Sequence, residues 1–158
     1  MFSEGQSVAY TNYSGDGGVG IGSFFRRLGF ALRYSELNLL ISNQLSDDSK
    51  LIMERNVVSR VKKAAPFLYT DNDPYLALIE GNLFWIIDMY TVSDKYPYAQ
   101  PADTRRINEN SGLPLNFNYL RNSVKAVVNA YDGTLNFYVV DENDPLIATY
   151  NDIFPNLF

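Results

Sequence analysis

Apolar, aromatic and β-branched residues are concentrated near the middle of the chain in two runs that flank a turn signal, and this pattern predicts a β-hairpin. The segments Tyr75–Glu80 and Leu83–Val92 have the pattern of its two strands. Between them lies Gly81-Asn82, a pair suited to a tight two-residue turn. A turn at these two residues places Tyr75 opposite Asp88.

The second strand of this hairpin has two largely apolar faces, which is typical of a central strand. Successive side chains of a strand point to opposite sides, so its residues divide into two sets. One set is Leu83, Trp85, Ile87 and Met89, and the other is Phe84, Ile86, Asp88 and Tyr90. Asp88 is the one charged residue among them.

Two further strand-like runs around a turn signal predict a second hairpin closer to the C-terminal end. Its strands are Val124–Tyr131 and Thr134–Val140, and Asp132-Gly133 again suits a two-residue turn. In that register Val128 lies opposite Phe137, and the hairpin has one apolar face and one mixed face. The pattern leaves open how the two hairpins adjoin.

Five other segments predict helices, most of them from apolar residues at every third or fourth position. They begin at residues that commonly cap or start a helix, namely Ser23, Ser35, Ser46-Asp47-Asp48, Asn56 and Asp144-Pro145. Pro66 ends the helix that begins at Asn56, because proline cannot continue one. The predicted class is therefore α+β, with an antiparallel sheet of two β-hairpins covered by several short helices. These are the helices between residues 23 and 65 and the C-terminal helix.

The remaining segments predict a lead-in and a loop. Residues 1–22 are polar and rich in glycine, which predicts a flexible lead-in, and residues 23–158 then form a single α+β domain. The run Gly15–Gly22 contains a literal GxGxxG motif, but the segment before it is too short and polar for the strand of a dinucleotide site. Periodicity is lost from about residue 93 to 122, which predicts a long irregular loop.

Composition excludes several classes of function. The chain has 158 residues, a formal net charge of −5 and a pI of about 4.6, so it lacks the basic field that nucleic acid requires. It has no Cys and no His, which removes thiolate nucleophiles and the usual general base. Any catalysis would depend on carboxylates, Lys, Tyr or Ser, and we expect no cofactor. The apolar runs are far shorter than the roughly 20 residues that span a bilayer, so we expect a soluble chain.

Four aspartates in and around the first hairpin are the sharpest chemical feature, namely Asp71, Asp73, Asp88 and Asp94. They could act as general acid and base, and Asp71, Asp73 and Asp88 are candidate oxygen ligands for Ca²⁺ or Mg²⁺. The local alternative is that Asp71 and Asp73 shape a turn before Pro74, while Asp94 caps the end of a strand.

Asp88 is harder to explain locally, because the centre of an apolar strand desolvates a carboxylate. One alternative is a buried structural pair with Arg26, Arg27 or Arg121. The other is a carboxylate that faces a ligand.

Aromatic residues near these acids are further candidates for ligand binding. Tyr75 is predicted to face Asp88, while Tyr96 and Tyr98 follow the strand together with Asp94. Such rings can stack on a sugar or hold a peptide, although aromatic residues at strand ends also serve simply as packing.

Five stretches of the chain, in order, resemble a known family. They are FFRRLGFALRYSELNLLIS, ERNVVSRVKKAAPFLYTDNDPY, LFWIIDMYTVSDKYPY, NYLRNSVKAVVNAYDGTLNFYV and DPLIATYNDIFPNLF. They resemble the soluble part of the UPF0182 proteins, large bacterial membrane proteins of uncharacterised function with several N-terminal transmembrane helices. The resemblance implies a fragment whose partner is its own transmembrane region and whose soluble portion faces the outside of the cell. It implies no activity.

Two functions from different classes follow from these observations. The first is a non-enzymatic module of a membrane protein that binds a protein partner or an envelope component, because no nucleophile and base form a coherent set. The second is a carboxylate-based or metal-assisted hydrolase acting on a cell-envelope substrate, centred on Asp88 and Asp94. The hydrolase requires these two carboxylates and a third acid around one concave pocket, within about 10 Å of each other.

Overall fold

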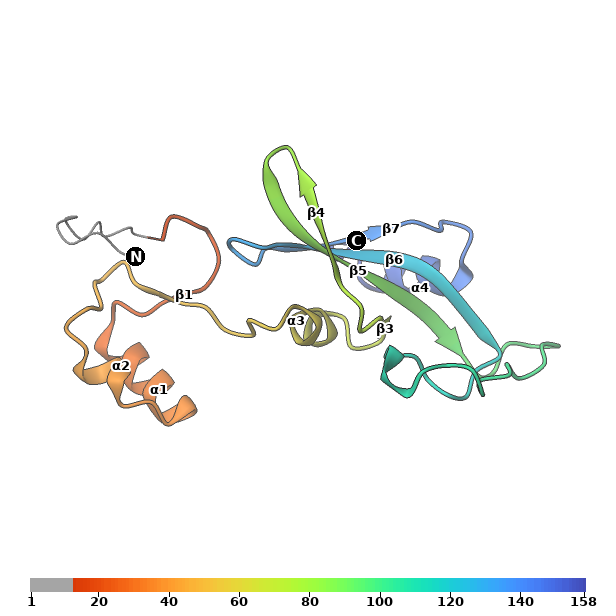
Figure 1. The fold of residues 1–158 in the computed structure, drawn as a ribbon, viewed down its shortest axis with the longest axis horizontal. Coiled ribbons are helices and arrows are strands. Elements are labelled where there is room, and N and C mark those ends of the chain that lie inside the picture. The colour runs from red at the N-terminus through yellow and green to blue at the C-terminus, as the bar shows by residue number, and fades with distance from the viewer. Residues whose placement is uncertain (1–12) are drawn as a thin grey trace, which may run out of the picture. The chain divides into compact units, whose positions relative to one another are not determined.

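A computed structural model describes residues 13–158 and divides the chain into two compact units, Met1–Ile52 and Met53–Phe158 (Figure 1). The first twelve residues of the predicted lead-in lie outside the described residues. The boundary after Ile52 differs from the single domain expected from residue 23 onward. Its physical reason is that each unit has a β-sheet of its own.

The first unit is a small α/β arrangement. Its elements are β1 (Val19–Gly20), α1 (Phe24–Tyr34), α2 (Asn38–Ile41) and β2 (Lys50–Leu51). Strands β1 and β2 pair antiparallel, so the glycine-rich segment takes part in a sheet instead of being only a lead-in. Helix α1 begins after Ser23, as predicted, and buries Ala31.

The second unit contains the main antiparallel sheet. Its elements are α3 (Val57–Ala64), β3 (Tyr69–Thr70), β4 (Tyr75–Ile79), β5 (Asn82–Ser93), η1 (Glu109–Ser111), β6 (Tyr119–Asn129), β7 (Leu135–Val139) and α4 (Pro145–Ile153). The strand order is β3-β5-β6-β7, and β4 pairs with β5 on the same side as β3. The two predicted hairpins, β4–β5 and β6–β7, adjoin through β5 and β6. The α+β class and both hairpins are confirmed.

The first hairpin turns one residue earlier than predicted. Glu80 and Gly81 both have positive φ, 51° and 82°, which is the geometry of a type I′ turn. Leu78 consequently lies opposite Leu83, and Tyr75 lies opposite Ile86 instead of Asp88. The register is shifted by two residues, and a shift of two leaves every side chain on its predicted face.

The second hairpin is also shifted by two residues, because its connection is longer than two residues. Val128 lies opposite Leu135, not Phe137. The Asn129 N–H donates to the Thr134 carbonyl at 2.9 Å, and the Asn129 side chain accepts from the Tyr131 N–H at 2.8 Å. This side-chain bond favours a four-residue connection, which the pattern of alternation does not reveal.

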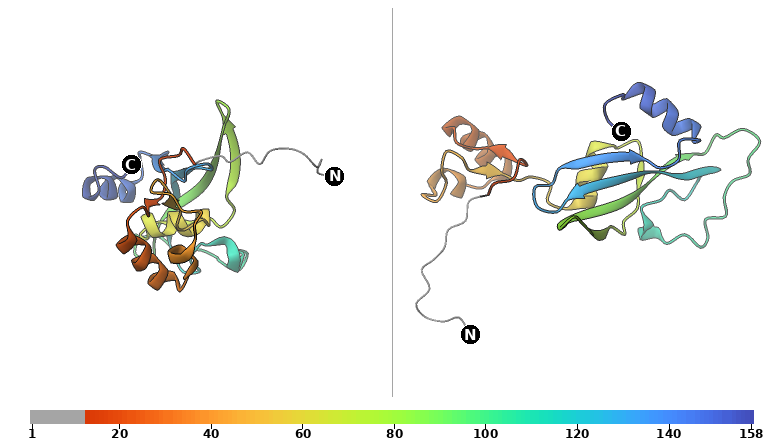
Figure 2. Two further views of the ribbon diagram at one scale, coloured as in Figure 1. Left: turned by 90° about the vertical axis from the view of Figure 1, so that its left-hand side faces the viewer. Right: turned by 90° about the horizontal axis from the view of Figure 1, so that it is seen from above.

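Helices α3 and α4 and one face of the sheet form the core of the second unit (Figure 2). The buried cluster consists of Val61, Ala65, Leu68, Ile87, Met89, Val124, Ala126, Val128, Phe137 and Ile147. Helices α1 and α2 belong to the first unit.

Arg60 of α3 ties the beginning of the second unit to the β6–β7 turn. Its guanidinium donates to the carbonyls of Glu54 at 3.1 Å and of Met53 at 2.9 Å. A further bond from the same group goes to the carbonyl of Gly133. One side chain therefore joins two segments that are far apart in sequence.

The long connection from β5 to β6 is fixed at several points. Asn72, after β3, donates from its side chain to the Asn110 carbonyl at 2.8 Å and from its N–H to the Ser111 carbonyl at 3.1 Å. Gly112, with φ of 85°, lies so close to the Thr70 carbonyl oxygen that an added Cβ would overlap it. Helix η1 is thereby held against the end of β3.

Candidate functional site

The face of the sheet opposite α3 and α4 carries the sequence-predicted residues Tyr75 and Asp88. The pairing of strands places side chains on this open face in rows. In one row, the Asp71 N–H donates to the Asp88 carbonyl at 2.9 Å, Asp88 lies opposite Lys125, and Lys125 lies opposite Tyr138. Three strands and the loop after β3 therefore contribute neighbouring polar groups.

Asp88 forms an ion pair with Lys125 at the centre of this open face. The two side chains are 25% and 35% exposed, so the pair is partly solvated and not buried. The hydrogen bond to Asp88 raises the pKa of Lys125, while burial opposes that shift. The predicted partners Arg26, Arg27 and Arg121 are wrong, because Lys125 takes this role and Arg121 instead pairs with Asp141 at 2.8 Å.

Tyrosines surround the ion pair. Tyr75 lies opposite Ile86, next to Asp88 on the same face, and Tyr69 lies opposite Tyr90. Tyr69, Tyr75 and Tyr138 are 41%, 45% and 55% exposed, respectively. Burial raises the pKa of Tyr90, and the carboxylates of Asp71 and Asp88 raise it further, while Lys125 opposes them.

The other predicted acids are less closely associated with Asp88. The Asp71 side chain accepts the Asp73 N–H at 3.1 Å, which is the turn geometry of the local alternative. Asp94 follows the end of β5, and the rise of about 3.3 Å per residue places its Cα roughly 20 Å from that of Asp88. The structure thus brings Asp71 near Asp88 but does not bring Asp94 there.

Tyr96 and Tyr98 lie on the loop that follows β5. Tyr96 stacks on Tyr119 with ring centroids 4.7 Å apart, and its backbone is held at both ends by the Asn118 side chain. Tyr98 is fully exposed and has a positive φ of 60°. These two rings belong to a different region of the molecule from Tyr75.

Within residues 13–158, no three Asp or Glu side chains come together in a way that could hold a metal ion. Lys125 supplies a positive charge at the position where a cation beside Asp88 would otherwise lie. Asp71, Asp73 and Asp88 therefore do not converge on one metal position among the described residues.

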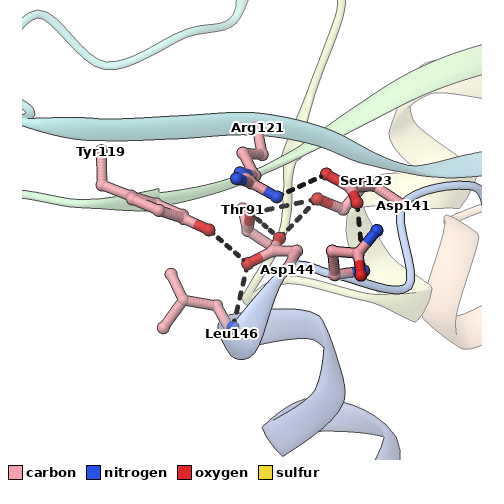
Figure 3. A network of polar contacts seen from close by, with 8 residues as sticks. Thr91, Tyr119, Arg121, Ser123, Asp141, Asp144 and Leu146 are labelled. Atoms are coloured by element: carbon pink, nitrogen blue, oxygen red, sulfur yellow. Dashed lines mark hydrogen bonds and ion pairs between the residues drawn. The ribbon is translucent and has the colours of Figure 1, made fainter.

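A second polar cluster surrounds Asp144, the residue that caps α4, as the sequence predicts (Figure 3). Its carboxylate accepts hydrogen bonds from the hydroxyls of Thr91 and Ser123, from the Tyr119 hydroxyl at 2.6 Å and from the Leu146 N–H at 2.9 Å. Asp144 is fully buried. The cluster joins β5, β6 and α4.

The hydrogen bonds determine the ionisation of this cluster. Burial opposes the charged form of Asp144 and is the largest single effect, but the bonds from Ser123, Thr91, Tyr119 and Leu146 together hold its pKa below the ordinary value of 3.8. Burial, followed by the hydrogen bond to Asp144, raises the pKa of Tyr119 to about 12. Because Thr91, Ser123 and Asp144 are inaccessible to solvent, this cluster positions α4 on the sheet.

Lys125, Tyr69 and Tyr138 belong to the site on the open face, although the sequence pattern does not single them out. Strand pairing alone places Lys125 opposite Asp88, Tyr69 opposite Tyr90, and Tyr138 opposite Lys125. One feature of the sequence could have indicated Lys125. It lies on the mixed face of the second predicted hairpin, which carries the polar side chains of that hairpin.

Among the described residues, no helix has both the length and the apolar character needed to cross a membrane. No solved structure matches the chain. Known sequences, however, do match it over nearly its whole length.

One similar protein, a UPF0182 protein of Trichodesmium erythraeum (strain IMS101), is 50% identical over 158 residues, which cover 95% of this chain and 17% of that protein. Another, from Clostridium novyi (strain NT), is 45% identical over 150 residues, covering 95% of this chain and 15% of that protein. The chain thus spans about a sixth of the length of these relatives. The model of an uncharacterised protein family, UPF0182, matches residues 2–158. The chain therefore belongs to the UPF0182 family.

Proposed function

We propose that this part of the UPF0182 protein is a non-enzymatic binding module and that the open face of its main sheet contacts the ligand. One observation carries the proposal. Three half-exposed tyrosines, Tyr69, Tyr75 and Tyr138, surround the Asp88–Lys125 ion pair on a face that the core helices α3 and α4 leave uncovered.

The chemistry of this face suits a glycan of the cell envelope. Tyrosine rings offer apolar surfaces for the C–H faces of sugar rings, and their hydroxyls can exchange hydrogen bonds with sugar hydroxyls. The Asp88 carboxylate and the Lys125 ammonium neutralise each other but keep further hydrogen-bonding capacity, since both are partly exposed. A neutral, hydroxyl-rich polymer matches these groups better than a strongly charged one.

The proposed location follows from the family. The module would belong to the part of a longer membrane protein that lies outside the cytoplasm, with the transmembrane region of that protein as its nearest partner. The resemblance to UPF0182 proteins supports this location, and the share of 17% and 15% that the chain covers in two relatives supports a longer protein around the module. The hydrolase has less support, because Asp94 lies far from Asp88 along β5.

Binding to purified bacterial peptidoglycan tests the proposal. The chain is pelleted with the insoluble glycan, and the bound fraction is measured over a range of glycan concentrations. We expect the double variant Tyr75→Ala/Tyr138→Ala to bind at least tenfold more weakly than the wild type. Tyr131→Ala is the matched control, because Tyr131 is 61% exposed but lies in the β6–β7 turn.

The conservative double variant Tyr75→Phe/Tyr138→Phe keeps the rings and should retain most of the binding if stacking dominates. Circular dichroism establishes that each variant is folded. A wild-type chain that stays in the supernatant, or a control that loses as much binding as the double alanine variant, would contradict the proposal.

A further inference from the structure

Strand β7 is the last strand of the main sheet, so one of its sides has no neighbouring strand among the described residues. Two hydrogen bonds determine which backbone groups point to that side. The Asn129 N–H donates to the Thr134 carbonyl, and the Val140 N–H donates to the Ser123 carbonyl, at 2.9 and 2.8 Å. Hydrogen-bonded pairs alternate with non-hydrogen-bonded pairs in antiparallel strands.

Thr134, Asn136, Tyr138 and Val140 therefore direct their N–H and C=O groups toward β6. Leu135, Phe137 and Val139 direct theirs away from the sheet. The side chains of these three residues point toward the core, where Phe137 is buried. The outer edge of β7 thus offers three donors and three acceptors in a straight row.

This edge lacks the usual protection against pairing. Natural edge strands are commonly protected by a charged side chain, a proline or a bulge. The sequence of β7, Leu135 to Val139, is LNFYV and contains neither a charge nor a proline, and its pairing with β6 is regular. Such an edge readily pairs with another strand.

Two cavities lie along β7 and limit what can pair with it. One, of about 460 Å³, lies between Leu135–Tyr138 and the C-terminal residues Asn156–Phe158. The other, of about 260 Å³, lies between Val139 and residues of α4, including Ile147 and Asn151. The first has no charged side chain in its lining. Because the C-terminal residues and α4 flank the edge, a single extended segment fits beside β7 better than the wide sheet of a second copy.

We infer that β7 binds an extended, uncharged segment of the longer UPF0182 polypeptide as an additional strand of the main sheet. Every second side chain of the bound segment would be apolar and would enter the cavity beside Leu157 and Phe158. The backbone of the segment would form hydrogen bonds with the outward N–H and C=O groups of Leu135, Phe137 and Val139. The source of the segment follows from length, because the chain covers only 17% of the Trichodesmium relative and 15% of the Clostridium novyi relative. Most of the polypeptide in those proteins lies outside the matched region.

Hydrogen exchange at single amides tests this inference directly. Exchange is measured in the 158-residue chain and in the full-length Trichodesmium relative, at the positions that align with β7. We expect the outward amides of Leu135, Phe137 and Val139 to exchange at least tenfold more slowly in the full-length protein. The inward amides of Asn136 and Tyr138 are an internal control and should be protected in both.

Each outcome decides the question. Equal exchange of the outward amides in both proteins overturns the inference. Protection already present in the 158-residue chain also overturns it, and a doubled mass in light scattering would then identify a second copy as the occupant. The variant Val139→Pro removes an outward donor without breaking the β6–β7 ladder. It should abolish the added protection at Leu135 and Phe137, whereas Val139→Ala should keep it.

Discussion

Ser123 and Val124 are adjacent in the sequence, yet both side chains are fully buried on the same face of the sheet. The pairing of β5 with β6 explains this, because Met89 lies opposite Val124 and Tyr90 lies opposite Asn122, so Ser123 is the extra residue of a β-bulge. Without the bulge, a regular alternation would turn Ser123 to the open face. The bulge is thus the reason that Ser123 can donate to Asp144.

Replacing Asp144 should destabilise the second unit by removing the common acceptor of Thr91, Ser123 and Tyr119. We expect Asp144→Asn to cost about 2 kcal/mol and Asp144→Ala about 3 kcal/mol, because alanine also removes the cap of α4. Urea unfolding measures both values. Asn56→Ala, which removes only the cap of α3, is a control and should cost about 1 kcal/mol.

The cost of Asp144→Asn should depend on pH. The folded-state pKa of Asp144 is lowered, so the carboxylate contributes its stability above the unfolded-state value of about 3.9 and loses it as the pH falls through the folded value. The difference in unfolding free energy between wild type and Asp144→Asn should therefore reach its maximum near pH 6 and become smaller below about pH 4. A difference that stays constant down to pH 2 would show that the charge of Asp144 is unimportant.

Tyr119 should lose its proton only in strong alkali. Its folded-state pKa of about 12 exceeds the ordinary value of 10.0, so its stabilising effect is complete below pH 10 and is lost as the pH rises toward 12. Absorbance at about 295 nm, compared between wild type and Tyr119→Phe, isolates this titration. A difference spectrum with its midpoint near pH 10 would contradict the hydrogen bond from Tyr119 to Asp144.

Asp88→Asn should cost less than about 1 kcal/mol, because exposed and half-exposed ion pairs contribute little. A double-mutant cycle with Lys125→Met measures the coupling, which should fall further in about 0.5 M salt. A loss of about 3 kcal/mol or more would mean that the pair behaves as a buried one.

Alanine substitutions at two glycines with nearly equal φ distinguish the cost of backbone strain from the cost of steric overlap. Gly81 has φ of 82° and nothing within 4 Å of an added Cβ, so Gly81→Ala should cost about 1 kcal/mol. Gly112 has φ of 85°, and its Cβ would overlap the Thr70 carbonyl, so Gly112→Ala should cost at least about 2 kcal/mol more. Thermal unfolding of both variants checks this order. Equal losses would mean that η1 shifts to make room.

The sequence pattern correctly predicted which side chains of a hairpin share a face of the sheet. It did not correctly predict which residues of the two strands lie opposite each other. Both hairpins are shifted by two residues, since Glu80 accepts a positive φ and the Asn129 side chain favours a longer connection. Alternation reports only whether a residue is at an odd or an even position, so it does not detect a shift of two. Tyr75 and Asp88 consequently share a face as predicted, although they are not opposite each other.

The candidate site could be only partly predicted for a related reason. The sequence marks Asp88 as unusual, but its partner Lys125 is 37 residues away and meets it only because β5 pairs with β6. The buried role of Asp144 is not visible in the sequence for the same reason. A helix cap is a local signal, whereas its bonds to Thr91 and Ser123 depend on strand order and on one bulge.

Arg60 has a mechanical consequence. Its guanidinium holds the carbonyls of Met53 and Glu54 on one side and that of Gly133 on the other. Tension applied to the chain at Met53 would therefore pass through this side chain into the β6–β7 turn, and not only along α3 into the buried cluster around Val61. Force on the first residues of the second unit would therefore be distributed between α3 and the strands β6 and β7.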